Sequence, residues 1–310
     1  MGKVLDLFAK DDLSDRFEAV AAQENQCEII VGDSRKVLAK FPENSFQCAV
    51  TSPPYWGLRD YGIKGQIGAE MSLDDYIKDL VLVFREVRRV LAADGTFWLN
   101  VGDGYTSGGR TWRDADAKNK GRAMSYRAPT PDGLKPKDLI GVPWKIAFAL
   151  QADGWFLRSD IIWNKPNCQP ESVKDRPTRS HENIFLFSKS EKYFYDWESI
   201  QEPTVDGKQK HKNRRTVWNI NTEPYPGSHF AVYPRALASL CVQAGTKVGD
   251  RVLDPFFGAG TTGVVCNALG RKCTGIEIKE DYAQLALQRL SQRRGARIQA
   301  FELHHKHGGC

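Results

Sequence analysis

The sequence predicts an α/β protein with a mostly parallel, doubly wound sheet. Short apolar runs alternate with amphipathic helical stretches over residues 28–100, and the alternation returns over residues 234–293. A glycine-rich turn at residues 258–263 follows a strand-like run and precedes a helical one, which is the layout of a nucleotide-binding βαβ unit. A chain of 310 residues can bury a full core, and no internal repeat divides it, so we expect a single domain over residues 1–310.

The first regular block predicts strand, strand, helix and strand. The apolar run CEIIVGD ends at a Gly-Asp pair, and FQCAVTSPP ends at two prolines. A long stretch with apolar residues three and four apart predicts an amphipathic helix, which we expect Asp94-Gly95 to end. The expected elements are strands at 27–33 and 46–54, a helix at 73–91 and a strand at 96–103.

The second half of the chain alternates in the same way after a less regular middle. A loop rich in glycine and charge is expected at 104–137, and a second irregular segment, rich in proline, lysine, arginine and aromatics, at 164–215. Only the run ENIFLFSK within the second segment predicts a strand. The other expected elements are helices at 143–155, 234–245, 262–270 and 281–293 and strands at 156–166, 251–256 and 271–278.

Composition excludes several classes of protein. A net charge of +6 and a pI of about 8.8 permit a polyanionic partner without requiring one. The seven cysteines include no CxxC pair, which argues against a zinc site or a disulfide framework and fits a reducing cytoplasm. The chain begins without a signal-peptide core, and its apolar runs are too short to span a bilayer. The tail HHKHGGC lacks a second structured ligand set, so we expect no metal site. Because the apolar runs are short, we expect no membrane partner.

The glycine turn carries the first candidate site. Gly258, Gly260 and Gly263 spell GxGxxG, and Glu277 ends the next strand, where a carboxylate can accept hydrogen bonds from both ribose hydroxyls. Asp254 precedes the turn. Its carboxylate would repel a pyrophosphate but attract the α-ammonium of S-adenosylmethionine, which favours that cofactor over a dinucleotide. The plainer interpretation is that Asp254 only caps the turn.

The sequence TSPPYW at residues 51–56 is the second candidate site. It follows a predicted strand, so it should lie at the carboxyl edge of the sheet, where ligands bind in doubly wound folds. The Ser52 hydroxyl and the Pro53 carbonyl could accept hydrogen bonds from an exocyclic amine and stabilise the positive charge that develops on it. Tyr55 offers a flat face for a flipped base, and we expect that face to matter more than its hydroxyl. The predicted catalytic residues are Ser52, Pro53, Pro54 and Tyr55.

The two motifs together resemble the S-adenosylmethionine-dependent amino-group DNA methyltransferases of the permuted (beta) class, in which the catalytic tetrapeptide precedes the cofactor loop. The resemblance covers residues 28–293. It implies a single catalytic domain with a Rossmann-like, seven-stranded, mostly parallel sheet and one reversed strand. It also implies that Asp33 in GDS contacts the adenine and that HFAVYP at 229–234 closes over the methionine moiety. The cofactor residues so predicted are Asp33, Phe230, Asp254, Phe256, Gly258, Gly260, Thr261 and Glu277.

The target base is predicted to be cytosine, methylated at N4, with adenine N6 as the alternative. In the family that the chain resembles, serine at the first tetrapeptide position is commoner among cytosine-N4 enzymes and aspartate among adenine-N6 enzymes. A hydroxyl can accept from the amine or donate to the ring nitrogen beside it, whereas a carboxylate only accepts. Methylation at cytosine C5 needs a cysteine nucleophile, and Cys48 lies inside the preceding strand, where we expect it to pack in the core.

Double-stranded DNA is the expected partner, and the basic segments 104–137 and 164–215 are the candidate contact surfaces. The sequence leaves open whether a cognate restriction endonuclease is a partner and whether the chain forms a homodimer. Two other interpretations remain, a nucleotide-dependent oxidoreductase and a catalytically silent DNA-binding module. The predicted DNA-contacting residues are Trp56, Lys165, Arg176, Arg179, Arg214 and Arg215.

Overall fold

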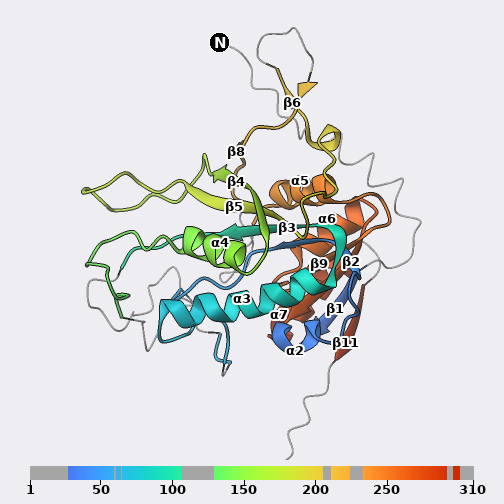
Figure 1. Cartoon of the computed structure of the whole chain (residues 1–310), viewed down its shortest axis with the longest axis horizontal. Coiled ribbons are helices and arrows are strands. Elements are labelled where there is room, and N and C mark those ends of the chain that lie inside the picture. Colours follow the sequence, from blue (N-terminus) through green and yellow to red (C-terminus); the bar gives the residue numbers. More distant parts are fainter. Residues whose placement is uncertain are drawn as a thin grey trace, which may run out of the picture.

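A nine-stranded sheet forms the centre of the described molecule (Figure 1). The structure is a computed structural model that describes residues 27–58, 61–63, 65–106, 129–204, 211–223, 233–291 and the backbone of 296–300. The strands run in the order β11-β1-β10-β9-β2-β3-β5-β4-β8. Their bounds are β1 Cys27–Val31, β2 Phe46–Thr51, β3 Leu91–Val101, β4 Phe156–Asn164, β5 His181–Ser188, β8 Val217–Asn219, β9 Arg251–Asp254, β10 Lys272–Glu277 and β11 Ala296–Ala300.

One strand of this sheet is reversed. β5 pairs antiparallel with both of its neighbours, β3 and β4, and the other pairings in the sheet are parallel. The predicted α/β class with one reversed strand is confirmed. The predicted count of seven is wrong, because short edge strands, β8 and β11, extend the sheet to nine within the described residues. β8 has three residues, too few to show a period in the sequence.

Helices cover both faces of the sheet. α2 (Ser34–Leu38), α3 (Leu73–Val90) and α4 (Val142–Ala152) enclose one apolar core, and α5 (Arg235–Gly245), α6 (Thr261–Ala268) and α7 (Glu280–Ser291) enclose the other. Neighbouring residues of β3 point to opposite faces. The Phe97 ring lies 4.8 Å from Phe84 of α3, and the Trp98 ring lies 6.3 Å from Trp218 on the other side. A 3-10 turn, Glu198–Ile200, and a two-stranded ribbon, β6 (Glu202–Pro203) with β7 (His211–Lys212), lie outside the main sheet.

The junction of α3 and β3 differs from the sequence prediction. Ser72 caps the helix by accepting from the Asp75 amide at 3.1 Å, but the helix ends at Val90 rather than at Asp94-Gly95. The predicted helix range of 73–91 is therefore confirmed to within one residue, and only the expectation that Asp94-Gly95 ends the helix is corrected. The buried side chain of Leu91 explains the early end, because Leu91 already pairs with Phe46 of β2 as extended chain.

The strand directions bring both candidate motifs to one edge of the sheet. β1, β10, β9 and β2 are parallel neighbours, so the residues that follow them lie side by side. Gly32 confirms this closeness, since its amide donates to the Glu277 carbonyl at 2.9 Å. In the part of the chain that the structure describes, no helix is long and apolar enough to cross a membrane.

Candidate functional site

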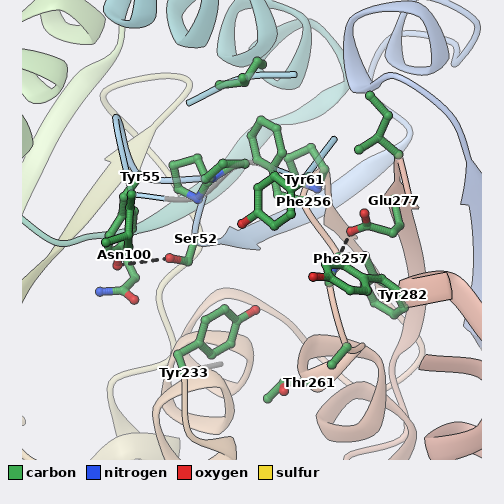
Figure 2. Close-up of a pocket in the computed structure, with 18 of the residues that line it drawn as sticks. Ser52, Tyr55, Tyr61, Asn100, Tyr233, Phe256, Phe257, Thr261, Glu277 and Tyr282 are labelled. Carbon is green, nitrogen blue, oxygen red and sulfur yellow. Dashed lines mark hydrogen bonds between the residues drawn. The ribbon is translucent and has the colours of Figure 1, made fainter. Parts of the chain in front are cut away.

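A cavity of about 580 Å³ opens at this edge of the sheet. Ser52 and Tyr55 lie on one side of it, and Glu277 and Tyr282 lie on the opposite side (Figure 2). Both candidate motifs therefore line one space, as the sequence predicted. Further lining residues come from the ends of β1, β3, β4 and β5 and include Asp33, Asn100, Trp163, Lys165 and Glu182.

Glu277 is held in place by two backbone amides. Its Oε2 accepts from the Gly258 N–H at 2.8 Å, and its Oε1 accepts from the Lys279 N–H at 2.9 Å. Burial raises the pKa of the carboxyl to about 7. Each carboxylate oxygen can accept more than one bond, so an ionised Glu277 keeps acceptor capacity at the cavity wall for a pair of ligand hydroxyls.

The glycines of the GAGTTG turn serve different purposes. Gly258 lines the cavity at φ +51°, and an added Cβ would meet no atom within 4 Å, so the backbone is open to a ligand there. Gly260, at φ +77°, instead begins α6. Gly263 and Gly275 make room for the Phe257 ring, which an added Cβ would meet at 2.8 Å and 2.2 Å. The sequence predicted Gly258 and Gly260 as cofactor contacts, and it did not predict the packing role of Gly263 and Gly275.

Asp254 is buried beneath the cavity and not on its wall. Its Oδ1 accepts from Thr51 Oγ1 at 2.6 Å and from the Phe256 amide at 3.1 Å. Its Oδ2 accepts from Tyr233 Oη at 3.1 Å and from Thr262 Oγ1 at 2.5 Å. Burial raises its pKa, and the hydrogen bonds from Thr262 and Thr51 oppose that rise. The carboxylate thus caps the turn and fastens β2 to β9 and α6. A direct bond to a cofactor ammonium stays a prediction.

Asp33 lies at the amino end of α2. Its Oδ1 caps the helix through the Arg35 amide at 2.9 Å, and its Oδ2 forms an ion pair with the Arg35 guanidinium at 2.7 Å. The same guanidinium contacts Asp79 at 3.3 Å and the Gly65 carbonyl at 2.8 Å. Asp33 lines the cavity and holds Arg35, which in turn contacts Gly65.

An aromatic wall stands beside Asp33 and Glu277. Tyr61, Phe256 and Tyr282 line this part of the cavity, and the rings of Tyr61 and Tyr282 are 6.0 Å apart (Figure 2). Thr261 also lines the cavity and contacts Arg289 at 3.3 Å. The predicted contact at Phe230 lies outside the described residues.

The tetrapeptide is fixed from two directions. Tyr76 Oη donates to the Pro54 carbonyl at 2.8 Å, and both Pro53 and Pro54 line the cavity. The Tyr55 ring lies against Gly102, where an added Cβ would come within 2.5 Å of Tyr55 Cε2. Ser52 Oγ donates to Tyr55 Oη at 3.3 Å (Figure 2). The motif is rigid before any substrate arrives.

Glu182 is a site residue that sequence reasoning missed. Its Oε2 accepts from Tyr55 Oη at 2.9 Å and from Asn100 Nδ2 at 3.1 Å. Its Oε1 pairs with the Lys165 ammonium, which lies 4.2 Å from the centre of the Trp163 ring. The available signal was an acid at the start of an otherwise apolar run, ENIFLF.

Several predicted DNA contacts have other partners in this structure. Lys165 lines the cavity and forms an ion pair with Glu182. Trp56 packs against the core and donates to the Glu70 carbonyl at 3.1 Å. Arg214 is half-buried and donates to the carbonyls of Ile200 and Gln201. These contacts favour structural roles for Trp56 and Arg214.

Of the remaining cationic candidates, Arg215 is exposed, whereas Arg176 and Arg179 are partly buried. Arg215 pairs with Glu202, and Arg176 pairs with Glu171 and lies 3.9 Å from the Tyr105 ring centre. The Nη1 of Arg179 is buried without a hydrogen-bond partner among the described residues. The strand predicted within the segment 164–215 is confirmed as β5. Residues 107–128 of the segment 104–137, and the histidine-rich tail, lie outside the described residues.

Cys48 is confirmed as a core residue. Its side chain is fully buried, and Thr96 Oγ1 donates to its sulfur at 3.6 Å. Burial raises the pKa of the thiol to about 12. A thiol in that setting is neither exposed nor ionised, and it cannot attack a base.

The chain matches the DNA methylase family model of N6/N4 methyltransferases over residues 46–288. It belongs to this family. The type II methyltransferase M.SmaI of Serratia marcescens is 68% identical to it over 290 residues, which cover 94% of this chain and 98% of that protein. The type II methyltransferase M.Cfr9I of Citrobacter freundii is 58% identical over 266 residues, covering 86% and 88% of the two chains.

Solved methyltransferase structures share the fold. A Thermus thermophilus protein, described as a putative DNA modification methylase and complexed with S-adenosyl-L-methionine, is 27% identical with a TM-score of 0.62 and covers 89% of this chain and 99% of its own. The cytosine-N4-specific PvuII DNA methyltransferase is similar in fold, with a TM-score of 0.63 at 20% identity, covering 86% and 89% of the two chains. This DNA methylase uses S-adenosylmethionine, and the open acceptors of Glu277 beside an aromatic wall fit the ribose and adenine of that molecule.

Proposed function

We propose that this DNA methylase is a type II modification enzyme of the permuted (beta) class that methylates the N4 amine of a flipped cytosine in double-stranded DNA. The observation that carries the amine chemistry is the hydroxyl of Ser52 at the tetrapeptide's first position, with its hydrogen already engaged by Tyr55. A hydroxyl so engaged does not donate to the ring nitrogen of the base, so the choice of cytosine rests on the donor at Lys165 instead. The order of motifs supports the class, since TSPPYW at 51–56 precedes the glycine turn at 258–263.

The chain's own groups act on the amine. S-adenosylmethionine supplies a methyl group on a positively charged sulfur, which a nucleophile attacks directly. Because the Ser52 hydrogen points at Tyr55, the serine lone pairs are free to accept from the amine. The Pro53 carbonyl offers a second acceptor on the cavity wall. Two fixed acceptors hold the amine lone pair out of the ring and stabilise the charge that develops on nitrogen. As nitrogen bonds to the methyl group, the bond to sulfur breaks and its electron pair stays on sulfur, and the methylated nitrogen then gives up one proton to solvent. Tyr55 provides the face for stacking.

The donors around the cavity favour cytosine over adenine. Cytosine carries a ring nitrogen and a carbonyl oxygen along the edge that bears its amine, and both are acceptors. Lys165 presents an ammonium to the cavity, and an ammonium only donates. Adenine has no carbonyl for such a group. Adenine N6 remains the second candidate, because its amine could meet the same two acceptors.

The type II context rests on the relatives. M.SmaI and M.Cfr9I both carry that designation and match nearly the full length of the chain. A restriction endonuclease with the same recognition sequence is therefore the proposed cellular partner, and DNA binding would place the enzyme on the nucleoid. Arg176, Arg179 and Arg215 are the proposed phosphate contacts among the described cations.

One experiment tests the proposal directly. Plasmid DNA is incubated with the enzyme and S-adenosylmethionine, digested to nucleosides and analysed by mass spectrometry. N4-methylcytosine is the expected product, and single-molecule sequencing of the same DNA gives its sequence context. A product of N6-methyladenine would show that the target base is adenine and would leave the proposed mechanism intact. 5-Methylcytosine, or unmodified DNA, would refute the mechanism.

A further inference from the structure

Glu182 is the meeting point of the polar groups around the tetrapeptide, although it belongs to neither motif. It lies at the start of β5, and its side chain is 17% exposed. Three donors converge on its carboxylate: the hydroxyl of Tyr55, the amide of Asn100 and the ammonium of Lys165. These donors come from three different segments of the chain, and each of them lines the cavity.

The carboxylate fixes the direction of the hydrogens around it. An ionised carboxylate only accepts, so Tyr55 must donate its single hydroxyl hydrogen to Glu182. The Tyr55 oxygen is then an acceptor, and Ser52 donates to it at 3.3 Å. With its hydrogen committed, Ser52 presents lone pairs only. A reversed order would point the serine hydrogen at the amine and repel the hydrogens that must be accepted.

Glu182 also places a cation in the cavity. It holds the Lys165 ammonium beside the Trp163 ring, where attraction to the ring face adds to the ion pair. An ammonium has three N–H donors, and the ion pair takes one side of it. The carboxylate thus sets both the acceptor and the donor that a target base would meet.

We propose that Glu182 is a positioning residue for methyl transfer. It orders the chain Ser52 to Tyr55 to Glu182 so that serine accepts from the target amine, and it holds Lys165 as a donor to the ring edge. The inference rests on the proposed function, because it assigns a role within that same base pocket.

Glutamine at position 182 is the primary test, since it keeps the size of the side chain and removes its charge and one acceptor. Glu202 gives a matched control, because it is 13% exposed and also pairs with two cations, Lys212 and Arg215, away from the cavity. Tyr55→Phe breaks the same chain without touching the ion pair. A merely structural role for Glu182 would not link its effect to that of Tyr55.

The measurements are the single-turnover rate of methyl transfer from radiolabelled S-adenosylmethionine to duplex DNA, the affinity for S-adenosylmethionine alone, and the melting temperature. Glu182→Gln should lower the rate about 10- to 100-fold with unchanged cofactor affinity. At saturating DNA, Glu202→Gln should keep the parental rate, because the release of Arg215, a proposed phosphate contact, acts on DNA affinity and not on the transfer step. Tyr55→Phe should lower the rate similarly, which departs from the sequence expectation that the ring face matters more than the hydroxyl, because the hydroxyl links Ser52 to Glu182. The double variant should be no slower than the slower single variant, because both break one chain.

Two results would overturn the inference. One is a parental rate in Glu182→Gln. The other is a double variant whose fold-loss in rate equals the product of the two single fold-losses. This second criterion applies even if Glu182→Gln is less stable than the parent. Failure of the proposed function would give a different result, because the parent enzyme itself would then transfer no methyl group to an exocyclic amine of DNA.

Discussion

Cofactor affinity should depend on pH through Glu277. Burial raises the pKa of this carboxyl to about 7, and only the ionised form offers all its lone pairs to the ribose hydroxyls. A group with a pKa of about 7 is roughly one-tenth ionised at pH 6 and roughly nine-tenths ionised at pH 8. The dissociation constant for S-adenosylmethionine should therefore fall about tenfold between pH 6 and pH 8, which is about 1.4 kcal/mol.

The assay is isothermal titration calorimetry of the parent and of Glu277→Gln across this pH range. The cofactor's own titration affects both proteins equally and cancels in the ratio of their dissociation constants. The ratio should change about tenfold, because glutamine does not titrate. A ratio that stays constant from pH 6 to pH 8 would refute both the raised pKa and the ribose contact.

The same shift has a consequence for the stability of the cofactor-free protein. The folded-state pKa of Glu277 lies above the reference value of 4.5. Its contribution is therefore fully present below about pH 4.5 and is lost as pH rises through about 7. The full shift corresponds to roughly 3 kcal/mol at most. Denaturant titrations should show Glu277→Gln gaining stability relative to the parent as pH rises.

Three further perturbations probe the other parts of the site. Ser52→Ala should lower single-turnover methyl transfer about 10²–10³-fold while calorimetry finds unchanged cofactor affinity, since one preorganised contact is lost. Asp254→Asn should destabilise the fold by about 1–3 kcal/mol in urea, because its amide would face donors; unaltered stability would contradict the buried network. DNA affinity should weaken steeply with salt, and Arg176→Gln with Arg179→Gln should flatten that dependence in filter binding; a parent slope near zero would remove the phosphate contacts.

Local patterns account for the parts of the fold that the sequence predicted. The apolar spacing of α3 is contained in one short stretch, so periodicity finds the helix. The motif positions follow from parallel strands, because Ser52 follows one strand and Glu277 ends another, and the two must share an edge. Edge strands such as β8 were not predicted, because three residues carry no periodic signal.

Spacing does not give the direction of a side chain, and this limits the prediction of site residues. Asp254 precedes the glycine turn as expected, yet it points inward to Thr51 and Thr262 rather than to the cavity. The basic segments show the same limit. A count of charges cannot separate Arg214, which is half-buried and donates to backbone carbonyls, from the more exposed Arg215 beside it.

The reversed strand explains why Glu182 was not predicted from the carboxyl ends of the strands. The rule that ligands lie beyond the carboxyl ends of strands is correct for the parallel members of the sheet. β5 runs the other way, so its amino end reaches the same edge, and the register pairs Glu182 with Trp163 near the end of β4. An acid at the start of a buried strand is therefore informative only once the strand's direction is known. In a mostly parallel sheet with one reversed strand, polar residues at the beginning of that strand belong in the search for the site.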